Sequence, residues 1–463
     1  MLESLTLDGG QARLSEDAVA GLRARLLGGL VLASDSDYDA ARKVWNGNVD
    51  RRPALIARCA EAADVQHAVT FAREHGLLLS VRGGGHSAPG YGVNDGGMVI
   101  DLTPMKQISV DPQSRTARVG GGVLWREFDA AAQVHGLATT GGTVSNTGVG
   151  GLTLGGGIGW LMGKHGATVD NLISAEVVTA DGTLVTASAA HNPDLFWALR
   201  GGGGNFGVVT SFEFRLHPVG QVVGGMLLYP LDQAGGMLRF YRDHAASLPD
   251  EAEVYAALLT APEIGPVGAL LMGYNGPVEE GLRVLAPWRN HGTPIADLVR
   301  PMSYSERQTL LDEPNAVHGL HRYWRSAFTE VLSDGLIDAS LEAAGRFSSP
   351  LNALLFFYMH GAGTRVPATE TAFSARAAQY DIDAIGCWSE ASESASHIAW
   401  VRGVWDRMEP HLQGRVYVNH IAVDDQPEKV RASFGDNYVR LRKVKAAYDP
   451  GNLFRMNSNI PPA

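Results

Sequence analysis

The sequence predicts an α+β protein of two domains, the first of which exposes an unusual amount of bare backbone. Over the first half of the chain, short apolar strands alternate with single helices, and glycine clusters stand between them. After Pro218 the glycine clusters thin out, and strand-like runs with helical stretches between them predict an antiparallel sheet flanked by helices. A chain of 463 residues is long for a single core, which also favours more than one domain.

The first domain is expected to span residues 1–218 and to contain two α+β subdomains. Apolar periodicity and capping residues predict helices at 15–27, 63–75, 124–135 and 194–200, with Asp64 near the start of the second. Strands are expected at 55–59, 77–81, 98–102, 116–119 and 208–214. Asp181-Gly182 between two apolar runs predicts a hairpin with a type I′ turn.

The second domain is expected to span residues 219–420. Its strands are predicted at 222–228, 254–259, 269–274 and 351–360, and its helices include 329–344 and 369–380. A last segment, residues 421–463, is expected to return to the first domain with a helix at 437–448.

Composition excludes several classes of protein. Hydrophobic residues make up 45% and charged residues 19%, as in a globular protein with a large interior. The net charge of -11 argues against a nucleic-acid surface. No basic start followed by an apolar run and no long apolar stretch is present, so we expect a cytoplasmic protein without a membrane span. The two cysteines, Cys59 and Cys387, predict neither a disulfide framework nor a metal site.

The stretch 80–90 is a glycine-rich bend that we interpret as the main binding loop of the chain. Gly83, Gly84 and Gly85 remove every side chain from a bend between Arg82 and His86, and Ser87 follows. Glycine lets a ligand approach the main chain, and N–H groups beside a cation suit a pyrophosphate. The G-x-G-x-x-[GA] pattern here is not a Rossmann fingerprint, because a Pro-Gly turn follows where a helix is required. A plain structural turn is the alternative.

A second glycine-rich run spans 141–166. Its glycines, which include Gly148, Gly150, Gly151 and Gly155, disfavour a helix or a central strand. Interleaved apolar residues such as Leu152 and Trp160 argue against disorder, so we expect this backbone to wrap against a ligand.

Other catalytic patterns are missing. The sequence has no HExxH or CxxC, no G-x-S-x-G nucleophile elbow and no P-loop, so no metal site is expected. An organic cofactor that brings its own chemistry is the remaining interpretation.

The motifs together resemble the flavin oxidases related to berberine bridge enzyme, within the vanillyl-alcohol oxidase (PCMH-type) superfamily, and in particular their bacterial branch. The matching pieces are 82–87, 148–160, 194–206, Tyr417-Val418-Asn419 and the tail 437–460, so the resemblance covers essentially the whole chain. It implies a two-domain fold in which residues 1–218 and the tail hold FAD and residues 219–420 bind the substrate. The residues implied to bind FAD are Arg82, Gly83, Gly84, Gly85, His86, Ser87, Gly148, Gly150, Gly151, Gly155, Val209 and Asn457.

The resemblance also implies that His86 is bonded covalently to the 8α carbon of FAD. Many relatives add a second bond from a cysteine, but Val144 stands at that position here. Because valine has no nucleophile, we predict attachment through His86 only.

Three residues are implied to act in catalysis. Thr147 stands where relatives carry an aliphatic residue that gates oxygen, and its hydroxyl either meets a flavin–oxygen species or is satisfied by backbone. His420 replaces the tyrosine that often serves as base, and Tyr417 either assists it or points into the core. Leu152, Trp160, Tyr358 and His360 either line the substrate pocket or pack in the core.

The expected reaction is hydride transfer from a small alcohol, sugar, amine or polyketide-like substrate to FAD, with reoxidation by O2 to H2O2. An oxygenating flavoenzyme of secondary metabolism and a non-catalytic flavin-binding protein are the alternatives. The expected partners are the small substrate and O2, without nucleic acid or membrane, in a monomer or homodimer.

Overall fold

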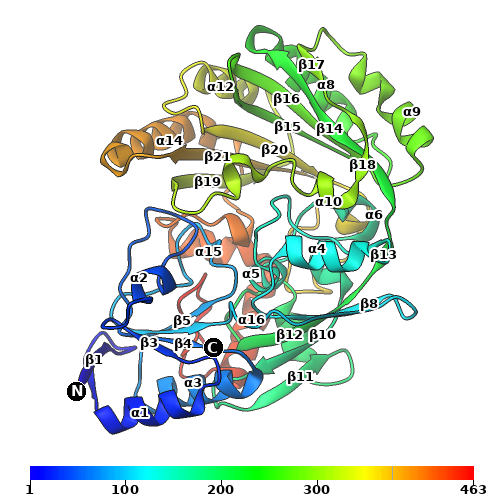
Figure 1. The fold of residues 1–463 in the computed structure, drawn as a ribbon. Coiled ribbons are helices and arrows are strands. Elements are labelled where there is room, and N and C mark those ends of the chain that lie inside the picture. Colours follow the sequence, from blue (N-terminus) through cyan, green and yellow to red (C-terminus); the bar gives the residue numbers. More distant parts are fainter. Residues whose placement is uncertain (378) are drawn as a thin grey trace.

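The computed structural model describes residues 1–377 and 379–463, and Figure 1 shows a lower part built on two sheets beneath an upper part built on one larger sheet. The α+β class and the antiparallel sheet of the second part are confirmed. The predicted domain limits stay a prediction.

The N-terminal sheet has four strands in the order β3-β4-β6-β5. These strands are β3 (Leu30–Leu32), β4 (Leu55–Arg58), β6 (Met98–Asp101) and β5 (Leu79–Arg82). Both β4 and β5 pair with β6 in parallel, which requires crossovers such as the helix α3 (Ala62–Glu74). Asp64 lies inside the first turn of α3, where its carboxylate accepts hydrogen bonds from the backbone of Leu27, Gly28 and Ala60 and so ties α1 (Glu16–Arg25) to the sheet.

The second sheet is antiparallel, with the order β11-β10-β12-β8-β7. Its strands are β7 (Ile108–Asp111), β8 (Thr116–Gly120), β10 (Leu172–Val178), β11 (Leu184–Ser188) and β12 (Val208–Arg215). The helices α4 (Trp125–Gln133), α7 (Pro193–Leu199) and α16 (Tyr438–Tyr448) share its hydrophobic core. The predicted hairpin β10–β11 forms, but its turn is not type I′, because Gly182 alone of the two turn residues has a positive φ (86°).

The upper sheet has eight strands, all antiparallel. Seven follow the order β17-β14-β16-β15-β20-β21-β19, and β18 pairs with β14. They are β14 (Gln221–Pro230), β15 (Ala252–Ala261), β16 (Gly265–Tyr274), β17 (Ala296–Asp297), β18 (Arg300–Ser303), β19 (His321–Thr329), β20 (Ala353–Met359) and β21 (Gln379–Trp388). One face packs under α8 (Leu231–Ala245), α9 (Val278–Arg289), α12 (Asp334–Ala344) and α14 (Ser394–Met408).

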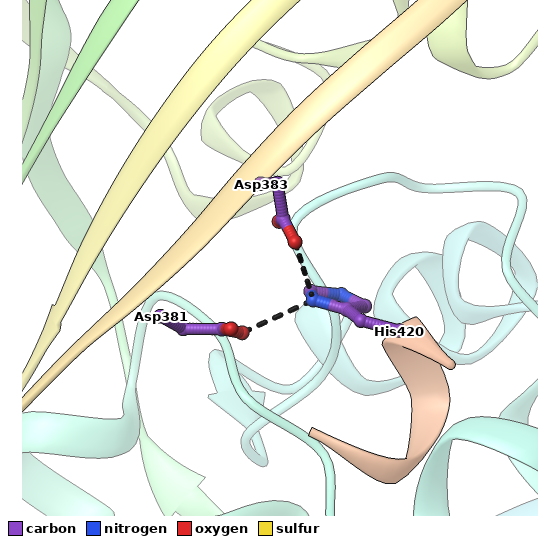
Figure 2. Close-up of side chains that lie close together, drawn as sticks. All are labelled: Asp381, Asp383 and His420. Atoms are coloured by element: carbon purple, nitrogen blue, oxygen red, sulfur yellow. Dashed lines mark ion pairs between the residues drawn. The ribbon is translucent and has the colours of Figure 1, made fainter. Parts of the chain in front are cut away.

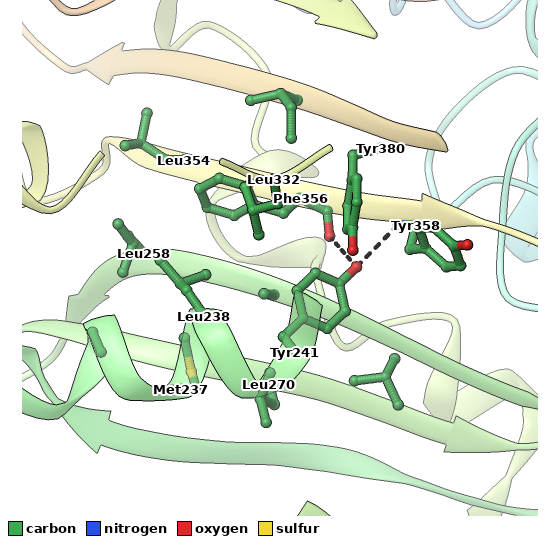
Figure 3. Close-up of a cluster of buried hydrophobic side chains, with 14 of the residues drawn as sticks. Met237, Leu238, Tyr241, Leu258, Leu270, Leu332, Leu354, Phe356, Tyr358 and Tyr380 are labelled. Atoms are coloured by element: carbon green, nitrogen blue, oxygen red, sulfur yellow. Dashed lines mark hydrogen bonds between the residues drawn. The ribbon is translucent and has the colours of Figure 1, made fainter. Parts of the chain in front are cut away.

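Figure 3 shows the centre of this helix-covered core. The hydroxyl of Tyr241 on α8 donates to the carbonyl oxygen of Phe356 at 2.9 Å and accepts from the backbone N–H of Tyr358 at 3.0 Å. A tyrosine can therefore be fully buried here at little cost, and it fixes α8 against β20.

The opposite face of the upper sheet is turned towards the lower part. Its buried residues include Tyr255, Phe357 and Ile385, which pack with Trp160 from the lower part. The alternation of side chains along each strand therefore divides the sheet into a structural face and a face that covers the site.

The remaining elements are short. They are β1 (Leu2–Leu5), β2 (Gln11–Leu14), α2 (Tyr38–Ala41), β9 (Leu137–Ala138), α5 (Val149–Leu154), α6 (Met162–His165), η1 (Thr168–Asn171), β13 (His217–Pro218), α10 (Tyr304–Arg307), α11 (Asp312–Asn315), α13 (Ala362–Arg365), η2 (Ala391–Glu393), η3 (Glu409–His411), η4 (Val418–His420), α15 (Pro427–Phe434) and η5 (Gly435–Asn437). Among the described residues, no helix is long and apolar enough to cross a membrane.

Two expectations about secondary structure were wrong. Gly150 and Gly151 lie in the short helix α5, where tertiary packing, including Val149 in the core, outweighs the low helix propensity of glycine. No helix forms over 369–377, and β21 begins at Gln379 (residue 378 lies outside the described residues). The strands β19 and β21 were not foreseen at all.

Candidate active site

A cavity of about 340 Å³ lies between the lower part and the face of the upper sheet that is not covered by helices. Two groups of lining residues come from opposite sides of it. The lower side contributes Gly83, Gly84, Gly85, His86, Ser87, Thr147, Gly148, Gly150, Gly151, Leu152, Val209 and Asn457. The upper side contributes Trp324, Leu355, Phe357, Asp381, Asp383 and Ile385, and η4 adds His420.

The two glycine runs meet backbone to backbone at the floor of this cavity. A Cβ atom on Gly84 would lie 2.6 Å from the Cα of Gly148, and one on Gly148 would lie 2.5 Å from the nitrogen of Gly84. No side chain fits at either position. A Cβ on Gly151 would meet nothing within 4 Å, so this glycine leaves open space for a ligand.

Arg82 lines the cavity, and its guanidinium is held by protein partners. Its side chain is buried, and Nε and Nη2 donate to the two carboxylate oxygens of Asp101 at 3.1 and 2.6 Å. Nη1 donates to the carbonyl oxygens of Ala41 and Lys43. Because Asp101 neutralises the guanidinium and most of its N–H donors are used, Arg82 braces the loop, and its contact with the cofactor stays a prediction.

His86 is half-buried and held on two sides. Its ring stacks on Trp45 with 4.0 Å between centroids, and its Nε2 lies 3.1 Å from Oδ1 of Asn146. Burial, followed by the charge of Arg322, lowers the pKa of His86 from 6.5 to about 3. The imidazole is therefore neutral at pH 7 and has a lone pair available for bonding.

Among the described residues, no cysteine lines the cavity. Val144, the position at which the resemblance implies a cysteine in many relatives, lines it, and neither Cys59 nor Cys387 does. The hydroxyl of Thr147 donates to the carbonyl oxygen of Val144 at 2.6 Å, so its proton is satisfied by backbone. This agrees with the expectation that the Thr147 hydroxyl is satisfied by backbone.

Three titratable side chains converge on the upper side of the cavity, as Figure 2 shows. Nδ1 of His420 lies 3.0 Å from Oδ2 of Asp381 and 3.1 Å from Oδ1 of Asp383, and both carboxylates are almost completely buried. Burial disfavours the charged imidazole, but the carboxylates of Asp383 and Asp381 outweigh it and raise the pKa of His420 to about 10. Burial also raises the pKa of Asp383. Since Nδ1 faces the carboxylates, Nε2 is the ring nitrogen left for a ligand.

The same cluster has the donor atoms of a metal site. One donor atom from each of Asp381, Asp383 and His420 lies within 4.8 Å of the other two. The predicted absence of a metal therefore stays a prediction that needs a direct test.

Tyr417 points into the core, in agreement with the second of its two interpretations. Its hydroxyl oxygen accepts from the backbone N–H of Gly157 and from Nδ2 of Asn419, both at 2.8 Å. Burial raises the pKa of Tyr417 well above its ordinary value, so this phenol is no base near neutral pH. Part of the Tyr417 side chain nevertheless lines the cavity, whereas Gly155 lies outside the lining, with its Cα packed against the amide of Asn419.

Three of the four predicted pocket residues also lie elsewhere. Trp160 is buried against Tyr255, and Tyr358 is in the helix-covered core. His360 lies 3.4 Å from Glu253, away from the cavity lining. Leu152 alone of the four lines the cavity.

The residues that sequence reasoning missed are Asp381, Asp383, Trp324, Trp45 and Asn146. A signal for the first two is present, since carboxylates at alternate positions of an apolar run fall on one face of a strand.

The lower side of the cavity fits a flavin nucleotide. Bare glycine backbone gives a flat group close approach, and Oδ1 of Asn457 is buried with no hydrogen-bond partner among the described residues. A ligand that donates a hydrogen bond there would satisfy it.

Comparison with known proteins agrees with this geometry. The family model for an FAD binding domain matches residues 53–188, and the model described as berberine and berberine like matches residues 416–461. The (R)-6-hydroxynicotine oxidase of Paenarthrobacter nicotinovorans is 32% identical over 94% of this chain and 97% of its own length. An uncharacterised FAD-linked oxidoreductase of Bacillus subtilis is 31% identical over 95% and 98%.

Solved structures show the same fold over the full length. The crystal structure of 6-hydroxy-D-nicotine oxidase from Arthrobacter nicotinovorans has a TM-score of 0.88 at 30% identity and covers 97% of this chain and 100% of that one. Glucooligosaccharide oxidase from Acremonium strictum has a TM-score of 0.86 at 25% identity and covers 96% and 99%. The chain is therefore an FAD-binding oxidoreductase of the berberine bridge enzyme-like family of FAD-linked oxidases.

Proposed function

We propose that this protein is an oxidase that holds FAD covalently through His86 alone, takes a hydride from a small organic substrate and passes the electrons to O2 to form H2O2. The observation that carries the proposal is the cavity in which neutral His86 and the Asp381–Asp383–His420 cluster line opposite sides. Glucooligosaccharide oxidase from Acremonium strictum has a cysteinyl and histidyl FAD, which supports a histidyl bond here. Val144 and the remote cysteines support one bond rather than two.

His420 is the base of the proposed reaction. Bound FAD supplies the hydride acceptor. Because the pKa of His420 is raised to about 10, the ring is charged near neutral pH, and the base is the neutral form that is reached as the pH rises. A substrate hydroxyl or amine gives its proton to Nε2 of that form, while Asp381 and Asp383 at Nδ1 stabilise the resulting imidazolium. A positioned carboxylate has this role in the serine protease triad, where it orients the histidine and is not itself protonated.

The walls of the cavity limit the substrate to a small organic molecule with an apolar body. Trp324 meets the ring of His420 edge-on at 4.9 Å between centroids, and Phe357 and Ile385 also line this side. Apolar walls with one convergent polar cluster are typical of a small-molecule site. Alcohols, sugars, amines and polyketide-like molecules are all within the proposed class, and a cytoplasmic monomer or homodimer is the proposed state.

The oxygenating alternative is less well supported. It needs a donor beside the flavin, and the hydroxyl proton of Thr147 is already given to Val144. We therefore propose that dioxygen is only an electron acceptor.

The test begins with the purified protein under anaerobic conditions and a panel of alcohols, sugars, amines and phenolic polyketides. At least one class is expected to bleach the flavin absorbance, and His420→Gln is expected to slow that bleaching without removing the flavin. Turnover of this substrate under ¹⁸O₂ should give peroxide and unlabelled product. Labelled product would establish oxygenation instead, and flavin that no class reduces would favour the non-catalytic alternative.

A further inference from the structure

We infer that Asn146 is a positioning residue that holds His86 in the tautomer with its proton on Nε2, so that Nδ1 bears the lone pair that bonds to FAD. The inference rests on the proposed covalent attachment. The FAD of glucooligosaccharide oxidase is N1-histidyl, and the inference adds which side chain selects that nitrogen here.

The orientation of the Asn146 amide is set by its other contact. Nδ2 of Asn146 donates to the carbonyl oxygen of Ala316 at 2.7 Å, which leaves Oδ1 directed at Nε2 of His86. An amide oxygen can only accept a hydrogen bond, so Nε2 must donate. Neutral imidazole has one N–H group, and its other nitrogen, Nδ1, is then deprotonated.

The loop that carries Asn146 is itself anchored. The backbone N–H and the hydroxyl of Ser145 both donate to the carboxylate of Asp312, at 2.8 and 2.6 Å. Asp312 begins α11, and Ala316 follows its end, so one short segment fixes the loop and the amide together.

The same segment also fixes the plane of the His86 ring. Nε1 of Trp45 donates to the carbonyl oxygen of Asn315 at 2.6 Å, and the indole stacks on His86 with 21° between the planes. Stacking sets the plane of the imidazole, and the hydrogen bond to Asn146 sets its rotation within that plane. Together they fix the ring and leave Nδ1 as the nitrogen that Asn146 does not engage.

The bond-forming step balances with dioxygen as the oxidant. One C–H bond of the flavin 8α methyl group and the imidazole N–H bond break, and a C–N bond from Nδ1 forms. The flavin ring takes up the electron pair and is then reoxidised by O2, which becomes H2O2 with the two protons released. The low pKa of His86 keeps the ring neutral for this step.

The test uses the flavin-loaded protein and measures the share of flavin that stays with the acid-precipitated chain over time in air. Asn146→Leu removes the acceptor, and Asn146→Asp keeps one. Asn171→Leu is the matched control, because Asn171 is equally buried (3% exposed, as is Asn146), donates to backbone carbonyls and accepts from Nε2 of another histidine, His217, outside the cavity.

Attachment in Asn146→Leu is expected to be about five- to tenfold slower than in the wild type, the loss expected when one hydrogen bond no longer selects the tautomer. Asn146→Asp should restore most of the rate, and Asn171→Leu should not change it. Peptide NMR of the wild-type adduct should show the bond at Nδ1.

Equal rates in Asn146→Leu and the wild type, no rescue by Asn146→Asp, or a bond at Nε2 would each overturn the inference while the covalent flavin stood. If Asn146→Leu does not fold, the rate of Asn146→Asp and the position of the bond decide. A wild-type protein whose flavin is entirely released by acid would instead refute the proposed attachment.

Discussion

Replacing Asp383 by asparagine removes one of the two carboxylates that face Nδ1 of His420. Against the burial that lowers it, the pair raises the pKa of His420 from 6.5 to about 10 in total, and the two oxygens lie at nearly equal distances, 3.1 and 3.0 Å. An equal division of this net rise gives a fall of at least about 2 in the pKa on losing one carboxylate, or ~2.5 kcal/mol, which lies within the range for a close opposite charge. We therefore expect His420 in Asp383→Asn to titrate at about pH 8 or below.

The assay is ¹H–¹³C NMR of the holoenzyme with ¹³C-labelled histidine across a pH titration. His420 is assigned as the signal that is missing in His420→Gln. Asp170→Asn is the control, because Asp170 pairs with Arg376 outside the cavity lining, and its loss should leave the His420 midpoint unchanged. A wild-type midpoint near 6.5, or an unchanged midpoint in Asp383→Asn, would show that the two carboxylates do not control the charge of His420.

The sign of the effect on turnover follows from the role of the base. Nε2 accepts a proton only when the ring is neutral, so kcat/KM should rise with pH as His420 loses its proton. In Asp383→Asn this rise should begin at lower pH, with a lower plateau because a weaker base takes the proton less readily.

Three further predictions concern the Arg82–Asp101 ion pair, the residues that line the cavity, and metal binding. Arg82→Gln leaves Asp101 buried without its cation and should lower the free energy of unfolding by ~3–5 kcal/mol in urea titrations, while adding Asp101→Asn should recover part of the loss. Tyr358→Phe alters a residue outside the cavity and should leave the rate of flavin reduction unchanged, whereas Trp324→Ala should slow it by about tenfold or more, ~1.4 kcal/mol. Dialysis against a chelator should change neither that rate nor the absorbance, and metal analysis should find well under one equivalent; a stoichiometric metal lost together with activity would make Asp381, Asp383 and His420 its ligands.

The glycine loops could be predicted from the sequence because the reason for a glycine run lies in the run itself. A run without Cβ atoms has few uses other than close approach, and Gly84 against Gly148 is such an approach. The sequence could not show that these two glycines meet each other, since 64 positions separate 84 from 148 and only the fold joins them.

The ion pair of Arg82 could not be predicted because its partner is set by strand register. β5 and β6 pair in parallel with Arg82 opposite Asp101, and this pairing neutralises the guanidinium. Both residues end apolar runs, so the partnership could be inferred only once the two strands are known to be neighbours.

The pocket residues were misjudged because side chains alternate between the two faces of a strand, and the sequence does not show which face lines the cavity. Along β20, Leu355 and Phe357 face the cavity, whereas Phe356 and Tyr358 face the helices. Both faces are apolar, so the alternation fixes two sets but not which set faces the ligand. Asp381 and Asp383 were not predicted as site residues, because 369–380 was interpreted as a helix and the strand that carries them was not predicted.

A single covalent bond between His86 and FAD underlies the proposed function, and the intact mass of the denatured protein decides whether it exists. We expect the mass of the chain plus one FAD for the wild type, the same adduct in Cys59→Ser and Cys387→Ser, and the bare chain for His86→Ala. A bare wild-type chain, or an adduct that survives His86→Ala, would rule out this attachment.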